Sequence, residues 1–265
     1  MKDVYFVDLD YEINQYNPFD NNKLFNNEWV ILKIVDDPNV NILVGKGKSN
    51  VYEVSISKYC EGWQYRIIDF INYHLNNNYK IVCSINKKDL NHAKEIYNNT
   101  NPYQLRYYEP KVLIHSTLPG YVDMIKESGC LKSWNRLKND STINDEQPIG
   151  RLLGDPKHYS DYIMLGEGIS CEIVVLSKQL NRIEMNIDLE YEPGGRFYFD
   201  ATRLASDDLL VRDGIHYKVK DELPIDHYLL SLITPKDIQF NNKAITPRSF
   251  TELSDRLFKK NFNGL

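Results

Sequence analysis

The sequence contains few cysteines, and it lacks a long apolar run. Its 265 residues include only Cys60, Cys83, Cys130 and Cys171, and no two of them have the CxxC spacing of a zinc or redox site. Each lies beside or within an apolar segment, so we expect buried, reduced thiols. No stretch approaches the roughly 18 consecutive apolar residues that cross a bilayer, and no charged and then apolar leader is present. We therefore expect a soluble, cytoplasmic protein with no membrane partner.

Positive charge is scarce as well. The 32 lysines and arginines are outnumbered by 37 aspartates and glutamates, which gives a formal net charge of −5. Broad, sequence-independent binding to nucleic acid needs a basic surface. The charge balance therefore argues against such binding, although it leaves a local basic groove open.

Several common catalytic signatures are missing too. The sequence has no cluster of metal ligands, no nucleophile elbow and no Rossmann fingerprint, so we expect no metal, and an enzyme that used NAD would not be a Rossmann dehydrogenase. The glycines of the run Gly45-Lys46-Gly47-Lys48-Ser49 are two residues apart, whereas a P-loop needs them five apart before a helix. Residues 51–56 alternate as in a strand, so we interpret the run as a hairpin turn.

The first part of the chain predicts a small α/β domain. Residues 63–75 place Trp63, Ile67 and Ile71 on one face at helical spacing, and residues 88–97 predict a second helix. Short apolar segments predict strands at 4–7, 28–35, 41–44, 51–56 and 79–85. The polar stretch 98–102 ends in proline and indicates a linker. We predict an N-terminal α/β domain of unknown role over residues 1–105.

The next strand ends in three polar residues. The segment 111–117 is apolar until His115, Ser116 and Thr117, and a Pro-Gly turn and an amphipathic stretch, expected to be a helix over 121–131, follow it. A strand that delivers polar groups to its end is a candidate ligand site, and a structural histidine is the alternative. Residues 148–156, which include Arg151, suit either a loop that closes over a ligand or a surface connection.

The rest of the chain predicts many short strands, at 162–166, 171–177, 194–200, 213–219 and 229–234. Short strands with one early helix are typical of an α+β domain, which we place at residues 106–242. Residues 243–265 would form a C-terminal helical tail with its helix at 250–258.

Ordered motifs in this second domain resemble the ADP-ribosyltransferase fold, in the branch of the RNA 2′-phosphotransferases and the toxins that modify DNA. His115-Ser116-Thr117 is similar to the His-Gly-Thr strand end of the phosphotransferases, and the segment 162–166 takes the place of their second strand. Residues 194–201 resemble their Gly-x-Arg strand that ends in Asp-Ala, and residues 213–223 resemble their aspartate-glycine turn and aromatic strand. The resemblance covers residues 111–240 and implies a split β-sheet domain.

The resemblance also implies a chemistry in which NAD is a substrate and its nicotinamide–ribose bond breaks through an oxocarbenium-like state. It implies that His115, Ser116 and Thr117 hold the adenosine ribose, that Arg196 pairs with the pyrophosphate and that Tyr162 stacks on nicotinamide. Glu222 stands where a carboxylate would stabilise the developing positive charge, and Arg151 would close over the dinucleotide. Structural alternatives remain: a core aromatic for Tyr162, and turn residues for Arg196 and Glu222.

Three functions follow from these motifs. The first is transfer of ADP-ribose from NAD to a macromolecular acceptor, protein or nucleic acid, by a toxin or a phage–host conflict protein; the carboxylate Glu222 favours it. The second is a non-catalytic interaction protein that retains the fold, since Tyr162–Gly166 lacks the histidine and serine of the phosphotransferase motif. The third is an NAD-dependent RNA 2′-phosphotransferase, which the acidic composition disfavours.

Overall fold

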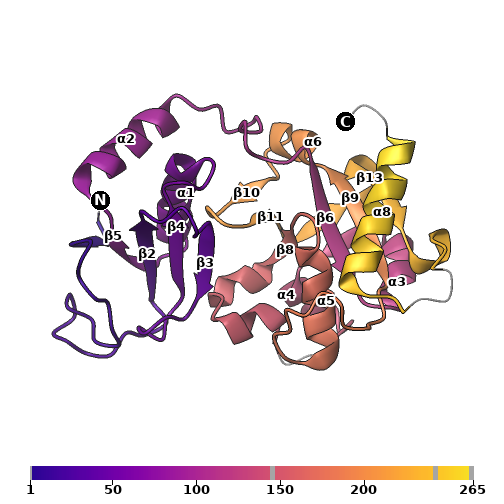
Figure 1. The fold of residues 1–265 in the computed structure, drawn as a ribbon, viewed down its shortest axis with the longest axis horizontal. Coiled ribbons are helices and arrows are strands. Elements are labelled where there is room, and N and C mark those ends of the chain that lie inside the picture. The colour runs from indigo at the N-terminus through magenta and orange to yellow at the C-terminus, as the bar shows by residue number, and fades with distance from the viewer. Residues whose placement is uncertain (1, 144–146, 241–243, 263–265) are drawn as a thin grey trace. The chain divides into compact units, whose positions relative to one another are not determined.

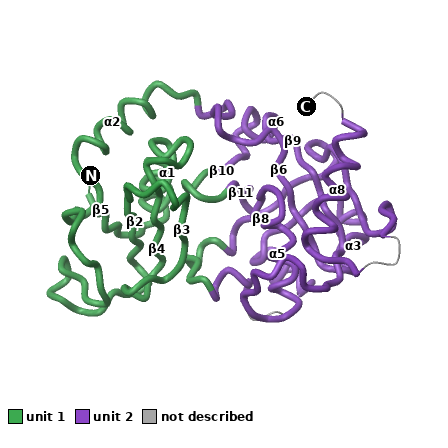
Figure 2. The backbone as a smooth tube through the Cα atoms, in the orientation of Figure 1, with its two compact units in different colours: residues 1–101, 153–159, 212–216 green, residues 102–152, 160–211, 217–265 purple. Residues whose placement is uncertain are grey.

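The computed structural model describes residues 2–143, 147–240 and 244–262, and it combines helices with several small sheets in an α+β architecture. The chain forms two compact units (Figure 2). Unit 1 comprises Met1–Asn101 and two short later segments, Leu153–Tyr159 and Arg212–His216. Unit 2 comprises Pro102–Leu152, Ser160–Val211 and Tyr217–Leu265.

Unit 1 is built on a five-stranded sheet in the order β1-β5-β2-β4-β3 (Figure 1). Its strands are β1 (Val4–Val7), β2 (Trp29–Val35), β3 (Ile42–Gly45), β4 (Glu53–Ser57) and β5 (Lys80–Ser84). All neighbours pair in parallel except β3, which is antiparallel to β4. Two helices accompany the sheet, α1 (Trp63–Asn76) and α2 (Lys87–Asn98).

The central strand β2 explains why this sheet forms. Its residues Val30, Ile31 and Leu32 are fully buried, as expected for a strand that is covered on both faces. The helical spacing that predicted α1 places Ile67, Phe70 and Ile71 in the core. The sequence prediction of both helices is therefore confirmed. The hairpin interpretation of residues 45–49 is confirmed too, because Gly45 pairs with Glu53 across an antiparallel turn.

The two late segments complete the core of unit 1, although the sequence placed them with the second domain. Tyr159 is almost fully buried and packs edge-on against Tyr52, with ring centroids 5.7 Å apart. Asp213 is fully buried and accepts hydrogen bonds from the backbone of residues 215 and 216. Burial and the nearby Asp213 carboxylate raise the pKa of Tyr159 well above its ordinary value. These residues belong to unit 1 because its apolar core surrounds them.

Unit 2 contains two three-stranded sheets, in the orders β13-β9-β6 and β10-β11-β8, and a pair of strands, β12 and β7. The strands are β6 (Val112–Thr117), β7 (Cys130–Lys132), β8 (Tyr162–Leu165), β9 (Gly195–Asp200), β10 (Val211–Arg212), β11 (Tyr217–Lys220), β12 (Glu222–Pro224) and β13 (Leu229–Ile233). A bridge between Ile114 and Gly166, with two backbone hydrogen bonds of 2.8 and 2.9 Å, joins the two larger sheets.

The helices of unit 2 are α3 (Tyr121–Ser128), α4 (Trp134–Asn139), α5 (Ser170–Leu180), α6 (Ala201–Ser206), α7 (Ile225–Tyr228) and α8 (Pro247–Asn261), with short 3-10 turns at Ile149–Leu153, Lys157–Asp161 and Pro235–Asp237. The core lies on both faces of the sheet that contains β6 and β9. Phe197 and Phe199 pack in one cluster, and Tyr198 packs with Phe258 of α8 in the other. The predicted terminal helix is thus confirmed, and the part of the predicted tail at 243 and 263–265 lies outside the described residues.

Two predictions in unit 2 are wrong. Residues 171–177 lie in the helix α5 and not in a strand: the β-branched run misleads, since Ile173 and Leu176 are buried at helical spacing whereas Val174 is half exposed. The helix expected over 121–131 ends at Ser128, because Gly129 adopts a left-handed φ of 68° and terminates it. Cys130–Lys132 then forms β7.

Candidate functional site

The strand β6 separates the three polar residues at its end. Side chains alternate along a strand, so His115 and Thr117 lie on one face and Ser116 lies on the other. The register agrees, because Ser116 stands opposite Arg196 of β9 whereas His115 stands opposite Phe197. The sequence grouped the three residues into one ribose-binding set, and the structure divides them between two environments.

His115 connects the two larger sheets of unit 2. Its Nδ1 lies 3.0 Å from the backbone oxygen of Met164 in β8. A carbonyl oxygen can only accept, so Nδ1 carries the proton in this arrangement and Nε2 holds a lone pair. Burial lowers the pKa of His115, which keeps the imidazole neutral near pH 7. Within the described residues Nε2 has no hydrogen-bond partner, and neither has the hydroxyl of Thr117 on the same face.

Ser116 belongs to a buried polar network on the opposite face. Its hydroxyl donates to Oε1 of Glu172 on α5. The Arg196 guanidinium donates to the same oxygen from 2.9 Å, and Tyr191 donates to Oε2 of Glu172 from 2.6 Å. Both Glu172 and Arg196 are fully buried. The three donors therefore compensate a carboxylate that would otherwise be costly to enclose.

The Arg196 guanidinium also connects β9 to the helix α8. It donates to Asp255 through Nε at 3.2 Å and Nη2 at 3.1 Å, and to the Gly168 carbonyl at 2.9 Å. The hydroxyl of Tyr198 donates to the same Asp255 oxygen from 2.8 Å. Burial alone would lower the pKa of Arg196, but the carboxylates of Asp255 and Glu172 together raise it. The guanidinium thus stays charged while fully enclosed, and contact with a pyrophosphate, which remains a prediction, would require it to leave these partners.

Tyr162 lies on β8, the strand whose Met164 carbonyl binds His115. The Nζ of Lys218 stands 5.2 Å from the centre of the Tyr162 ring, in a cation–π arrangement. Lys218 is fully buried, a position that the sequence did not indicate because lysine rarely occupies the interior of a sheet. One face of the Tyr162 ring is therefore occupied by Lys218.

Glu222 and Arg151 lie on other elements. Glu222 is on β12, opposite Lys132 of β7, and its Oε1 lies 3.1 Å from Nε of Arg136 on α4. Both side chains of this ion pair are partly exposed. Arg151 lies in the 3-10 turn Ile149–Leu153 and is partly buried. Ser116 and Arg196 thus share the Glu172 carboxylate, and His115 contacts the strand that carries Tyr162. Glu222 instead pairs with Arg136.

Glu172 is the member of this buried polar network that the sequence did not reveal. It is the single charged residue in the apolar segment 171–177, and a carboxylate inside such a segment is expected to be paired when buried. That signal was present. The prediction of a strand over residues 171–177 obscured it, because a strand there would not place Glu172 beside Ser116.

Comparison of the chain with protein-family models, with curated proteins and with solved structures finds no match. Among the described residues, no helix is both long and apolar enough to cross a membrane. Within the same residues, no group of three or more His, Cys, Asp or Glu side chains is arranged to hold a metal ion.

Proposed function

We propose that unit 2 is an ADP-ribosyltransferase domain that transfers ADP-ribose from NAD to a macromolecular acceptor, a protein or a nucleic acid. The observation that carries the proposal is the pair of polar groups at the end of β6. The Nε2 of a neutral His115 and the hydroxyl of Thr117 share one strand face, where the two larger sheets meet, and both lack a described partner. The two three-stranded sheets joined by the Ile114–Gly166 bridge are compatible with the split β-sheet that the resemblance implies.

These two groups suit the hydroxyls of a ribose. Nε2 of His115 would accept a hydrogen bond from one hydroxyl, and the Thr117 hydroxyl can either donate or accept. Tyr162 would stack on nicotinamide with the ring face opposite Lys218. Glu222 would stabilise the positive charge that develops as the nicotinamide–ribose bond breaks, once its pairing with Arg136 loosens. In this arrangement Ser116 and Arg196 support the strand through Glu172.

NAD titration calorimetry and an NAD-consumption assay with cell lysate test the proposal. The wild type should bind NAD and consume it. The variants His115→Ala and Thr117→Val should each weaken NAD binding by about tenfold or more, since each removes a hydrogen bond of about 1.4 kcal/mol. His227→Ala is the matched control, because His227 is exposed on α7, and it should bind as the wild type does.

Glu222→Gln separates catalysis from binding. The amide keeps the size of the side chain but loses its charge, so NAD binding should persist while turnover falls by about 10²-fold or more. A wild-type protein that neither binds NAD nor consumes it with any lysate would sink the proposal.

A non-catalytic interaction protein that retains this fold is the second candidate. Glu222 pairs with Arg136, and Lys132 stands opposite it on the neighbouring strand β7. These two cations weaken the electrostatic effect of the carboxylate on a substrate, which favours the non-catalytic protein. In this case NAD would bind without turnover, and Glu222→Gln would change neither the affinity for NAD nor the rate of its consumption.

A further inference from the structure

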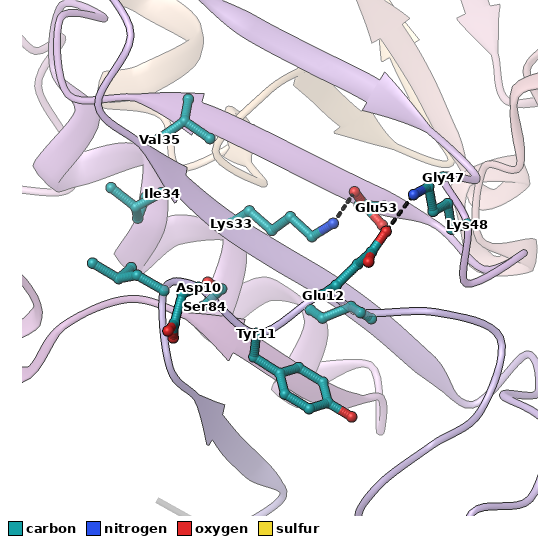
Figure 3. A pocket seen from close by; sticks show the side chains of 12 residues that line it. Asp10, Tyr11, Glu12, Lys33, Ile34, Val35, Gly47, Lys48, Glu53 and Ser84 are labelled. Atoms are coloured by element: carbon teal, nitrogen blue, oxygen red, sulfur yellow. Dashed lines mark hydrogen bonds and ion pairs between the residues drawn. The ribbon is translucent and has the colours of Figure 1, made fainter.

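A pocket of about 490 Å³ opens on one face of the sheet in unit 1 (Figure 3). Lys33 and Val35 near the end of β2 and Ser84 at the end of β5 line it, together with Glu53 at the start of β4. The segment 9–13, which follows β1, and the β3–β4 turn complete the lining. The volume of the pocket suits a small molecule.

The face of the sheet changes from apolar to charged as it reaches this pocket. Trp29 and Ile31 of β2 pack in an apolar cluster with Val82 of β5. Lys33 follows on the same face at the two-residue period of a strand, and Ser84 follows Val82 in the same way. The charged end is thus continuous with the core, and a lysine placed there is partly desolvated.

The pocket contains two ion pairs, each between a lysine and a glutamate. The Nζ of Lys33 lies 2.6 Å from Oε1 of Glu53, and only 26% and 13% of these side chains are exposed. Lys48 pairs with Glu12, and both of these side chains are largely exposed. Figure 3 shows the two pairs close together, with the ring of Tyr11 nearby.

Two polar atoms at the pocket have no described partner. Oε2 of Glu53 is buried without a hydrogen bond, and it lies so close to Gly47 that a Cβ there would collide with it. Ser84 as a residue is only 5% exposed, and no described residue hydrogen-bonds to its hydroxyl. A carboxylate oxygen accepts hydrogen bonds and a hydroxyl can donate or accept, so a ligand that brings both a donor and an acceptor suits this wall.

We propose that this pocket binds a small zwitterion of the α-amino acid class. A ligand of a single sign would break one ion pair and leave its other member uncompensated in a partly buried site, which is costly. A zwitterion compensates both signs: its carboxylate meets Lys33 and the Ser84 hydroxyl, and its ammonium meets Glu53 and Glu12. This site belongs to unit 1 alone and does not depend on the function proposed for unit 2.

The test uses the full chain and the common α-amino acids, each added singly at millimolar concentration, with calorimetry and thermal shift as readouts. At least one amino acid should bind. Its decarboxylated amine and its N-acetyl derivative, which each carry one sign of charge, should bind at least about tenfold more weakly, a difference of about 1.4 kcal/mol.

Two variants assign the binding to the pocket. Lys33→Met should weaken it by about tenfold or more, whereas Lys58→Met should not. The second is a matched control, because Lys58 pairs with Asp89 at 2.5 Å in the same unit with similar exposure, 27% and 19%. Glu12→Gln alters an exposed pair and leaves the fold intact, so it also weakens binding in a folded protein.

Three results would overturn the inference. The first is that no amino acid binds at millimolar concentration. The second is that Glu12→Gln and Lys33→Met, or Glu12→Gln alone if Lys33→Met does not fold, bind as the wild type does. The third is that an analogue of one charge sign, or a nucleotide, binds as tightly as the amino acid.

Discussion

At the scale of the residue, unit 2 depends on one enclosed arginine. Arg196 has no exposed surface, and it compensates two carboxylates that come from sequence positions 24 and 59 residues away. A buried ion pair adds little stability compared with apolar residues of the same shape, but the loss of one member leaves a charge without compensation. The consequences of this arrangement can be measured directly.

We expect Arg196→Met to destabilise the protein by about 3–5 kcal/mol, because it leaves Glu172 buried without its charge partner. Arg248→Met is the control: Arg248 pairs with Asp188 on the exposed surface, at 2.7 Å, and its loss should change the stability far less than the loss of Arg196 does. Urea unfolding, followed by circular dichroism, measures both. Equal effects of the two substitutions would contradict the role of Arg196.

His115 gives the stability a pH dependence of defined sign. Burial lowers its pKa in the folded protein below the ordinary value of 6.5, so below that pH the unfolded chain binds more protons than the folded one. The stabilisation is complete above about pH 6.5 and is lost as the pH falls toward the pKa of the folded state. The free energy of unfolding of the wild type, compared with that of His115→Gln, should therefore rise with pH up to about 6.5 and then level off.

At the scale of the element, the segment Arg212–His216 fits α1 through a glycine. Gly214 has a φ of +89°, and a Cβ on it would collide with the backbone oxygen of Arg66. Nη1 of Arg66 in turn donates to the Gly214 carbonyl from 3.2 Å. A left-handed conformation and a close approach of two backbones both require glycine here.

We expect Gly214→Ala to destabilise the packing of this segment on α1 by about 1–3 kcal/mol, through strain and overpacking together. Gly120→Ala is the matched control, because Gly120 has a φ of +86° but no atom within 4 Å of the place that a Cβ would take, so it isolates the strain. Hydrogen exchange of the α1 amides should accelerate in Gly214→Ala alone. Unchanged protection of α1 in that variant would contradict the prediction.

Elements with a regular apolar period were predictable from the sequence, and elements shaped by distant partners were not. The spacing of Ile67 and Ile71 identified α1 because a helix buries one face. The run Ile173-Val174-Val175 suggested a strand because β-branched residues favour one, and only the packing of α5 on other elements overrides that preference. The enclosure of Arg196 could not be foreseen, because neither Glu172 nor Asp255 is near it in sequence.

At the scale of the whole molecule, the chain enters unit 1 three times. The segments Leu153–Tyr159 and Arg212–His216 bring Tyr159 and Asp213 into its core, which the first 101 residues cannot fill alone. The polar linker at 98–102 predicted one boundary from local composition. It carried no information on the later segments, because a segment that packs with an earlier unit differs from an ordinary loop only in its distant contacts.

A truncated chain of residues 1–101 should therefore be less stable than unit 1 within the full protein. Without Tyr159, the ring of Tyr52 loses its edge-on neighbour, and the deletion of one buried aromatic ring by itself costs about 3–5 kcal/mol. The fragment should bind a hydrophobic dye and unfold over a broader denaturant range. The full-length variant Tyr159→Ala, measured alongside, should show a smaller loss of the same kind. A fragment as stable as the intact unit would contradict this view.

Because unit 1 is divided among three segments, its core cannot be completed until the last of them has been synthesised. A ribosome that has completed residue 101 must still add residues up to 216 before the last piece of this core exists. At ordinary elongation rates that interval is on the order of ten seconds. During it the nascent polypeptide carries apolar surface that Leu153–Tyr159 and Arg212–His216 have yet to cover.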